Sequence, residues 1–153
     1  MSQAAPSSDA ASPHALAARE AKRREALALG IDDRFISDLV DNFYARVRED
    51  SALGPIFDAR VKDWGEHLDR MKRFWRSVLF SSGEFLGNPM VKHVVIPGLD
   101  RALFDRWLLL FGQTLDELGD EAAREHVHSR ARMIAASLLN GIAMYSARRQ
   151  AND

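Results

Sequence analysis

Residues 63–75, DWGEHLDRMKRFW, carry the pattern that decides the fold. Asp63, with Glu66 three residues later, resembles a capping box in which aspartate takes the cap role, so a helix is predicted from here to about Ser81. One face of this helix carries an apolar stripe with helical spacing, formed by His67, Met71, Phe74 and Trp75. The stripe is strongly apolar yet contains an imidazole, and a single histidine in such a place is most often the half-buried edge of a core.

The same helical spacing extends on both sides of this segment. Helices are predicted from Asp32 or Asp33 to about Arg48, from Asp100 to about Leu118, and from Gly119-Asp120 to about Arg149. Glycine and proline fall between these segments, and no stretch shows sustained alternation of polar and apolar residues. The sequence therefore predicts an all-α fold with four principal helices. Gly54-Pro55 is interpreted as a break, followed by a loop that Ile56 and Phe57 anchor to the core.

The chain of 153 residues suits one domain with one sizeable core. Residues 1–15 are rich in Ala, Ser and Pro and are expected to be disordered. A short charged helix is expected over 16–28, so that residues 1–30 precede a helical domain over 31–149. The basic cluster in this helix is interleaved with Glu20 and Glu25, which argues against nucleic-acid binding.

Composition excludes several classes of protein. The formal net charge is -1, so neither nucleic acid nor an acidic membrane is expected as a partner. The sequence contains no cysteine, which excludes disulfides, thiolate metal sites, iron–sulfur clusters and covalent haem attachment. No apolar run approaches the roughly 20 residues of a membrane span, and the N-terminus lacks the pattern of a secretory signal. A cytoplasmic location is the expectation.

A long connection between helices contains the second histidine of interest. Residues 87–100 read GNPMVKHVVIPGLD and place His93 between two pairs of helix breakers. Tyr44, His67 and Trp107 lie on the apolar faces of three different helices. Each alone is most often core, but a ligand pocket needs a few convergent donors in an apolar cavity. A lone imidazole holds a bare metal ion poorly, and His126 and His128 point apart on a helix, so a cofactor with its own equatorial ligands, haem, is the remaining candidate.

In its motifs the sequence resembles the truncated haemoglobins, specifically their third group. The motifs are DNFYARVREDSALGPIF at 41–57, WGEHLDRMKRFW at 64–75, GNPMVKH at 87–93 and FDRWLLLF at 104–111. The resemblance implies a two-over-two helical sandwich reduced from the globin fold, with a mostly loop segment around His93. It implies haem b (iron protoporphyrin IX), with His93 as the ligand of a pentacoordinate iron. Further haem contacts are implied for Phe43, His67, Met71, Phe74, Trp75, Lys92 and Trp107.

For the opposite, distal side of the haem, the resemblance implies Tyr44, His67 and Trp107. The implied ligands are O2, NO and CO, with Tyr44 and Trp107 as hydrogen-bond donors and His67 as a mobile gate. Lys92, and Arg70 or Arg73, are candidates for contacts to the haem propionates. The alternatives are a haem enzyme, such as an NO dioxygenase or peroxidase supplied by an external electron donor, and a cofactor-free helical module that binds a protein partner.

Overall fold

The computed structural model describes residues 12–85, 87–94 and 96–152, and these form seven helices and no strand. The helices are α1 (Pro13–Ala28), α2 (Asp33–Glu49), α3 (Gly54–Arg60), α4 (Trp64–Phe80), α5 (Pro89–Val94), α6 (Arg101–Leu118) and α7 (Glu121–Asn152). The prediction of an all-α fold is confirmed, and each of the four principal helices begins and ends within three residues of its expected bounds.

Aspartates cap the start of four of these helices, three of them at the residues that the sequence predicts and the fourth, Asp120, at α7. The side chains of Asp32, Asp63 and Asp100 accept hydrogen bonds from the backbone N–H three residues later, at 2.8, 3.1 and 3.0 Å. Each satisfies one of the N–H groups that the first turn leaves without an intrahelical partner. The capping box at α4 is only half formed, because the Glu66 carboxylate bonds Arg70 at 3.0 Å instead of reaching back to the cap.

Two short helices differ from the sequence expectation. The loop expected after Gly54-Pro55 is helix α3, because a proline in the first turn is compatible with a helix start. Pro89 begins α5 in the same way, so His93 lies on a six-residue helix, while the described residues on both sides of α5 are non-helical. Helix α1 begins three residues earlier than expected, because Ser12 caps it and Pro13 takes its first position. Residues 1–11 of the expected tail lie outside the described residues.

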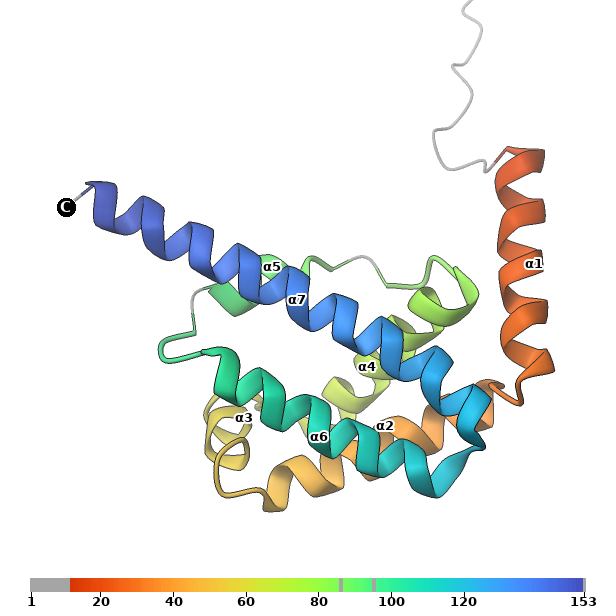
Figure 1. Ribbon diagram of the computed structural model, residues 1–153, viewed down its shortest axis with the longest axis horizontal. Coiled ribbons are helices and arrows are strands. Elements are labelled where there is room, and N and C mark those ends of the chain that lie inside the picture. Colours follow the sequence, from red (N-terminus) through yellow and green to blue (C-terminus); the bar gives the residue numbers. More distant parts are fainter. Residues whose placement is uncertain (1–11, 86, 95, 153) are drawn as a thin grey trace, which may run out of the picture.

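The principal helices form two pairs that cross (Figure 1). Helix α2 packs against α4, α6 packs antiparallel to α7, and α2 and α6 join the two pairs. Helix α1 packs on α4, whereas α5 lies against α7 and α3 against α2. This is the two-over-two sandwich that the resemblance implies.

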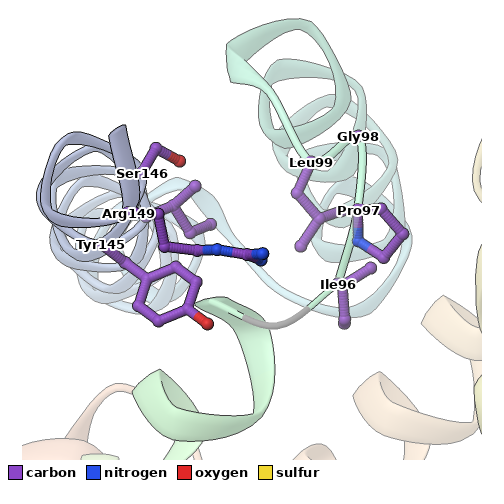
Figure 2. A pocket seen from close by; sticks show the side chains of 8 residues that line it. Ile96, Pro97, Gly98, Leu99, Tyr145, Ser146 and Arg149 are labelled. Carbon is purple, nitrogen blue, oxygen red and sulfur yellow. The ribbon is translucent and has the colours of Figure 1, made fainter. Parts of the chain in front are cut away.

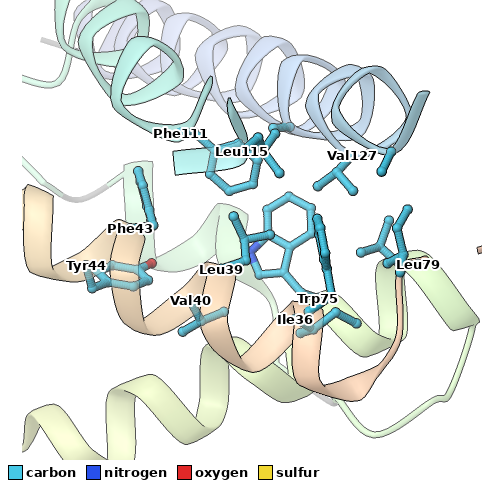
Figure 3. Close-up of a cluster of buried hydrophobic side chains, with 14 of the residues drawn as sticks. Ile36, Leu39, Val40, Phe43, Tyr44, Trp75, Leu79, Phe111, Leu115 and Val127 are labelled. Atoms are coloured by element: carbon cyan, nitrogen blue, oxygen red, sulfur yellow. The ribbon is translucent and has the colours of Figure 1, made fainter. Parts of the chain in front are cut away.

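Aromatic side chains fill the centre of the sandwich (Figure 3). Phe111 of α6 stacks on Trp75 of α4 with ring centroids 5.1 Å apart, and Phe43 of α2 meets Phe111 edge-on at 5.1 Å. Leu39, Leu79, Leu115 and Val127 are fully buried around these rings. Because burial of apolar surface is the main favourable term in folding, these contacts fix the angle between the two pairs.

A buried carboxylate ties the corner between α2 and α3 to α6. Asp50 Oδ1 accepts hydrogen bonds from Arg106 Nε and Nη2 at 2.8 and 2.6 Å, and Oδ2 accepts from the N–H groups of Ala52 and Leu53. The hydrogen bond from Arg106 is the main cause that lowers the pKa of Asp50 below its ordinary value. Arg106 directly precedes Trp107, so this contact also fixes the position of the Trp107 backbone within α6.

None of the helices in the described ranges has the length and apolarity needed to cross a membrane.

Candidate functional site

A cavity of about 710 Å³ opens beside the aromatic core, between α2, α3, α4, α5, α6 and α7. This volume lies within the range of about 300–1,000 Å³ that is typical of small-molecule and cofactor sites. The cavity gathers nearly all of the residues that the sequence singles out, which are Tyr44, His67, Arg70, Met71, Arg73, Phe74, Trp75, Lys92, His93 and Trp107. Phe43 is the exception, because it is 1% exposed and packs behind the cavity wall.

His93 reaches the cavity from α5 with one ring nitrogen already fixed. Its Nδ1 lies 2.6 Å from the carbonyl oxygen of Pro89. A carbonyl oxygen only accepts hydrogen bonds, so Nδ1 carries the proton and donates it. In the neutral imidazole, Nε2 then keeps its lone pair, which is the state and orientation that a metal ligand requires. The proline that begins α5 thus also supplies the carbonyl that sets the histidine tautomer.

His67 lies on α4 in a box of aromatic rings. The centroids of Tyr44, Trp64 and Phe57 lie 5.1, 5.6 and 6.3 Å from that of the imidazole. Its Nε2 is completely buried and has no hydrogen-bond partner in the described part of the chain. Burial lowers the pKa of His67 below its ordinary value, and the nearby charges of Arg70 and Lys92 lower it further. The histidine is therefore neutral at neutral pH and has an unused polar atom.

Tyr44 and Trp107 bring two further hydrogen-bond donors. Tyr44 is 5% exposed, and burial raises the pKa of its phenol far above the ordinary value, so the hydroxyl keeps its proton. Within the described residues, neither this hydroxyl nor the Trp107 indole N–H has a hydrogen-bond partner in the protein. Phe43 contacts both rings edge-on, at 5.0 and 5.4 Å, and so sets their separation from behind.

Cations surround the mouth of the cavity. Arg60, Lys62, Arg70, Arg73 and Lys92 line it, together with three acids, Asp63, Glu66 and Glu84. Each acid already has a protein partner: Asp63 caps α4, Glu66 bonds Arg70, and Glu84 forms a two-point ion pair with Arg76 at 2.9 and 3.1 Å. The remaining four cations form no ion pair within the described part of the chain. They leave a positive rim suited to ligand carboxylates.

Sequence reasoning missed part of the lining. Arg60 ends α3 and Lys62 lies two residues beyond it, and the sequence pattern does not predict this helix. Ile134, Ala135 and Leu138 of α7 form an apolar wall, and Leu103 and Phe104 of α6 adjoin it. The helical spacing of residues 134, 135 and 138 indicates a buried face of the helix. It does not indicate that this face lines a cavity.

A protein-family model for bacterial-like globins matches residues 27–140. The chain belongs to this globin family. Over 119 residues it is 33% identical to a group 3 truncated hemoglobin of Campylobacter jejuni, which covers 75% of this chain and 94% of that protein. The crystal structure of a group III truncated hemoglobin from Campylobacter jejuni matches with a TM-score of 0.70 and 33% identity, over 73% of this chain and 91% of that one. The resemblance to group III truncated haemoglobins is thereby confirmed.

Membership of this globin family implies a haem-binding protein, and the cavity fits a haem. Its walls are apolar, a single imidazole offers a lone pair from α5, and the unpaired cations at the mouth match the two carboxylates of the porphyrin. The described residues contain no group of three or more His, Cys, Asp or Glu able to hold a metal ion. His67 lines the cavity, and its buried Nε2 lacks a hydrogen-bond partner among the described residues, which is uncommon for a buried polar atom.

Proposed function

We propose that His93 Nε2 is the axial ligand of haem b iron and that the protein reversibly binds O2, NO and CO on the opposite side of the haem. The observation that carries this proposal is the hydrogen bond from His93 Nδ1 to Pro89, which leaves Nε2 unprotonated and directed by a helix that begins at a proline. Haem would be held by His93 and would supply the iron atom to which a gas molecule binds.

The other cavity residues would then have different roles, according to where they lie in the cavity. Met71, Phe74 and Trp75 of α4 would exclude water from the haem, while Lys92, Arg73, Arg60 and Lys62 would pair with its propionates. Arg70 is a weaker candidate for a propionate contact, because its guanidinium already forms an ion pair with Glu66. Phe43 acts behind the wall, by holding Tyr44 and Trp107 apart, and not as a direct haem contact.

Tyr44 and Trp107 present the donors for a diatomic ligand. Both donors lie on apolar walls, where a hydrogen bond to a ligand with partial negative charge is stronger than in water. Neither has a partner to give up within the described chain, so a ligand gains the full hydrogen bond. His67 remains neutral at neutral pH because of its lowered pKa, and can turn within its aromatic box to admit or retain a ligand.

Replacement of the proposed ligand tests this function. The purified protein is expected to show the intense blue-edge absorption of a haem protein, which responds to dithionite and then to CO. His93→Ala should weaken haem binding by at least about a hundredfold, since loss of outer-shell partners alone costs about 10- to 100-fold in metal affinity. Free imidazole added to His93→Ala should restore the five-coordinate ferrous spectrum, because the vacated space and the porphyrin remain.

His126→Ala is the matched control, since His126 is also half-buried but lies on α7 outside the cavity lining. Unchanged haem affinity and an unchanged ferrous spectrum in His93→Ala would contradict the assignment. A protein that binds no haem under any condition would contradict the proposed function as a whole.

A further inference from the structure

A second, smaller cavity lies against the loop of residues 96–99 (Figure 2). It has a volume of about 250 Å³ and lies between residues 96–99 and the last turns of α7. The loop contributes Ile96, Pro97, Gly98 and Leu99, and α7 contributes Ile142, Tyr145, Ser146 and Arg149. The volume is just below the usual range for ligand pockets, so an occupant would be smaller than a typical cofactor or drug.

This cavity is separate from the globin site, although the two are neighbours. Ile96 and Leu99 line both cavities and form the partition between them. The α7 wall of the smaller cavity begins at Ile142, beyond residue 140, where the match to the globin family model ends. The smaller cavity is thus built partly from chain that the family model does not cover.

The cavity has apolar walls, and polar side chains on α7. Ile96, Leu99 and Ile142 give it apolar walls, and α7 adds the Tyr145 phenol, the Ser146 hydroxyl and the Arg149 guanidinium. Figure 2 shows the Arg149 side chain extending from α7 across the cavity toward the loop, with the Tyr145 ring beside it. No acidic residue lines the cavity, and Arg149 forms no ion pair with any residue that the structure describes. Ser146 and Arg149 are exposed, so the guanidinium lies at the open side of the cavity, where no acidic lining residue pairs with its charge.

We propose that this cavity binds a small monocarboxylate with a compact apolar body. The planar Arg149 guanidinium offers two parallel N–H donors, which match the two oxygens of a carboxylate. The hydroxyls of Tyr145 and Ser146 offer further donors on the same wall, and the apolar body packs between Ile96, Leu99 and Ile142. An inorganic anion would leave these apolar walls unfilled, and a neutral molecule would leave the guanidinium unpaired.

Calorimetric titration with benzoate tests the proposal. The ferrous protein saturated with CO is used, so that the carboxylate has no vacant iron position to occupy. Benzoate is expected to bind with a Kd on the order of 1 mM or tighter, and benzyl alcohol, which has a similar apolar body without the charge, about tenfold more weakly. Arg149→Ala should weaken benzoate binding about tenfold, and Arg149→Lys should restore only part of the loss, because an ammonium cannot make the two-point contact.

Arg148→Ala is the matched control, because Arg148 is the adjacent arginine on α7, is exposed like Arg149 and does not line the cavity. It should leave benzoate binding unchanged. Equal effects of Arg148→Ala and Arg149→Ala, equal affinities for benzoate and benzyl alcohol, or no binding of benzoate at about 10 mM would each overturn the proposal. None of these outcomes bears on His93, and haem binding by Arg149→Ala should match that of the unmodified protein.

Discussion

Tyr44 lines the cavity, and its hydroxyl has no hydrogen-bond partner among the described residues. On a largely apolar wall, a donor that loses its water and gains no partner costs about 1–3 kcal/mol. A phenylalanine would fill the same volume without that cost. The hydroxyl is therefore best explained by a partner that enters the cavity, and its effect should appear in ligand binding and not in stability.

Tyr44→Phe is expected to raise the O2 dissociation rate about tenfold, because one hydrogen bond in a dry site is lost. Trp107→Phe should act in the same direction through the indole N–H. The midpoint of unfolding of Tyr44→Phe should be unchanged or slightly raised. Stopped-flow displacement of O2 by CO measures the rate, and Tyr145→Phe, the other tyrosine of the chain, is the control. An unchanged rate in both cavity variants would contradict the donor roles.

The lowered pKa of His67 sets the pH range in which it can act. Burial is the main cause, so the imidazole remains neutral until the pH falls below the ordinary value of 6.5. In the unfolded chain the proton binds as the pH passes 6.5, so His67 has no effect on stability above this pH and destabilises the fold progressively below it. Protonation in the folded state places a third positive charge beside Arg70 and Lys92, which favours movement of the ring toward solvent.

We therefore expect the CO association rate to be constant above about pH 7 and to rise as the pH falls below 6.5. Flash photolysis across this range measures the rate. His67→Ala should be fast at every pH, and His126→Ala should keep the pH dependence of the unmodified protein. A dependence that persists in His67→Ala would assign the titration to another group.

For individual residues, the sequence predicts which side chains line the cavity wherever helical spacing fixes the direction of the side chain. His67, Met71, Phe74 and Trp75 share one face of α4, and all four line the cavity. Phe43 shows the limit, because its position beside Tyr44 does not reveal that its ring turns toward Phe111 and into the core. Arg60 and Lys62 were missed because an exposed cation carries no periodic signal.

At the scale of elements, the short helices were the hardest to predict. Helix α3 has seven residues and α5 has six, too few for a hydrophobic period to repeat. Both exist through tertiary contacts: α3 follows the corner at which Asp50 accepts a hydrogen bond from Arg106 of α6 at 2.8 Å, and α5 packs on α7. Such contacts join residues far apart in the chain, so local sequence patterns do not encode them.

Gly54 is the residue that lets α3 approach α2 closely. A Cβ atom at this position would lie 2.9 Å from the carbonyl oxygen of Arg48 and 3.3 Å from that of Val47, both on backbone that cannot yield easily. Gly54→Ala should therefore displace α3, lower the free energy of unfolding by about 1–3 kcal/mol, and loosen the cavity wall formed by Ile56 and Phe57.

Gly65→Ala is the matched control for this prediction, since its Cβ would meet only the Asp63 side chain, at 3.4 Å. In the first turn of α4 it should be neutral or stabilising, by up to about 1 kcal/mol, because alanine favours helix. Urea unfolding of both variants measures the difference. Equal stability of the two variants would mean that the α2–α3 corner adjusts without cost.

On the scale of the whole molecule, the fold divides into a core and a shell around the cavity. The side chains of the aromatic core of α2, α4, α6 and α7 pack against one another beside the cavity. Helices α3 and α5 instead close the outer side of the cavity. The binary pattern of the long helices was enough to predict the core. The shell depends on what fills a space of about 710 Å³, and the pattern carries no information about that space.

This division predicts an uneven response to haem removal. A ligand that binds only the folded state stabilises it by mass action, and the gain falls mainly on segments that contact the ligand. In the haem-free protein, amides of α3 and α5 should exchange with deuterium at least about tenfold faster than in the holoprotein, while those of α2 and α6 in the core remain protected. Hydrogen–deuterium exchange read by mass spectrometry resolves these segments.

Helix α1, which packs on α4 outside the cavity lining, serves as the internal control and should exchange alike in both forms. Equal protection of α5 with and without haem would mean that α7 alone holds this helix, and that His93 is presented in advance and not fixed by the iron.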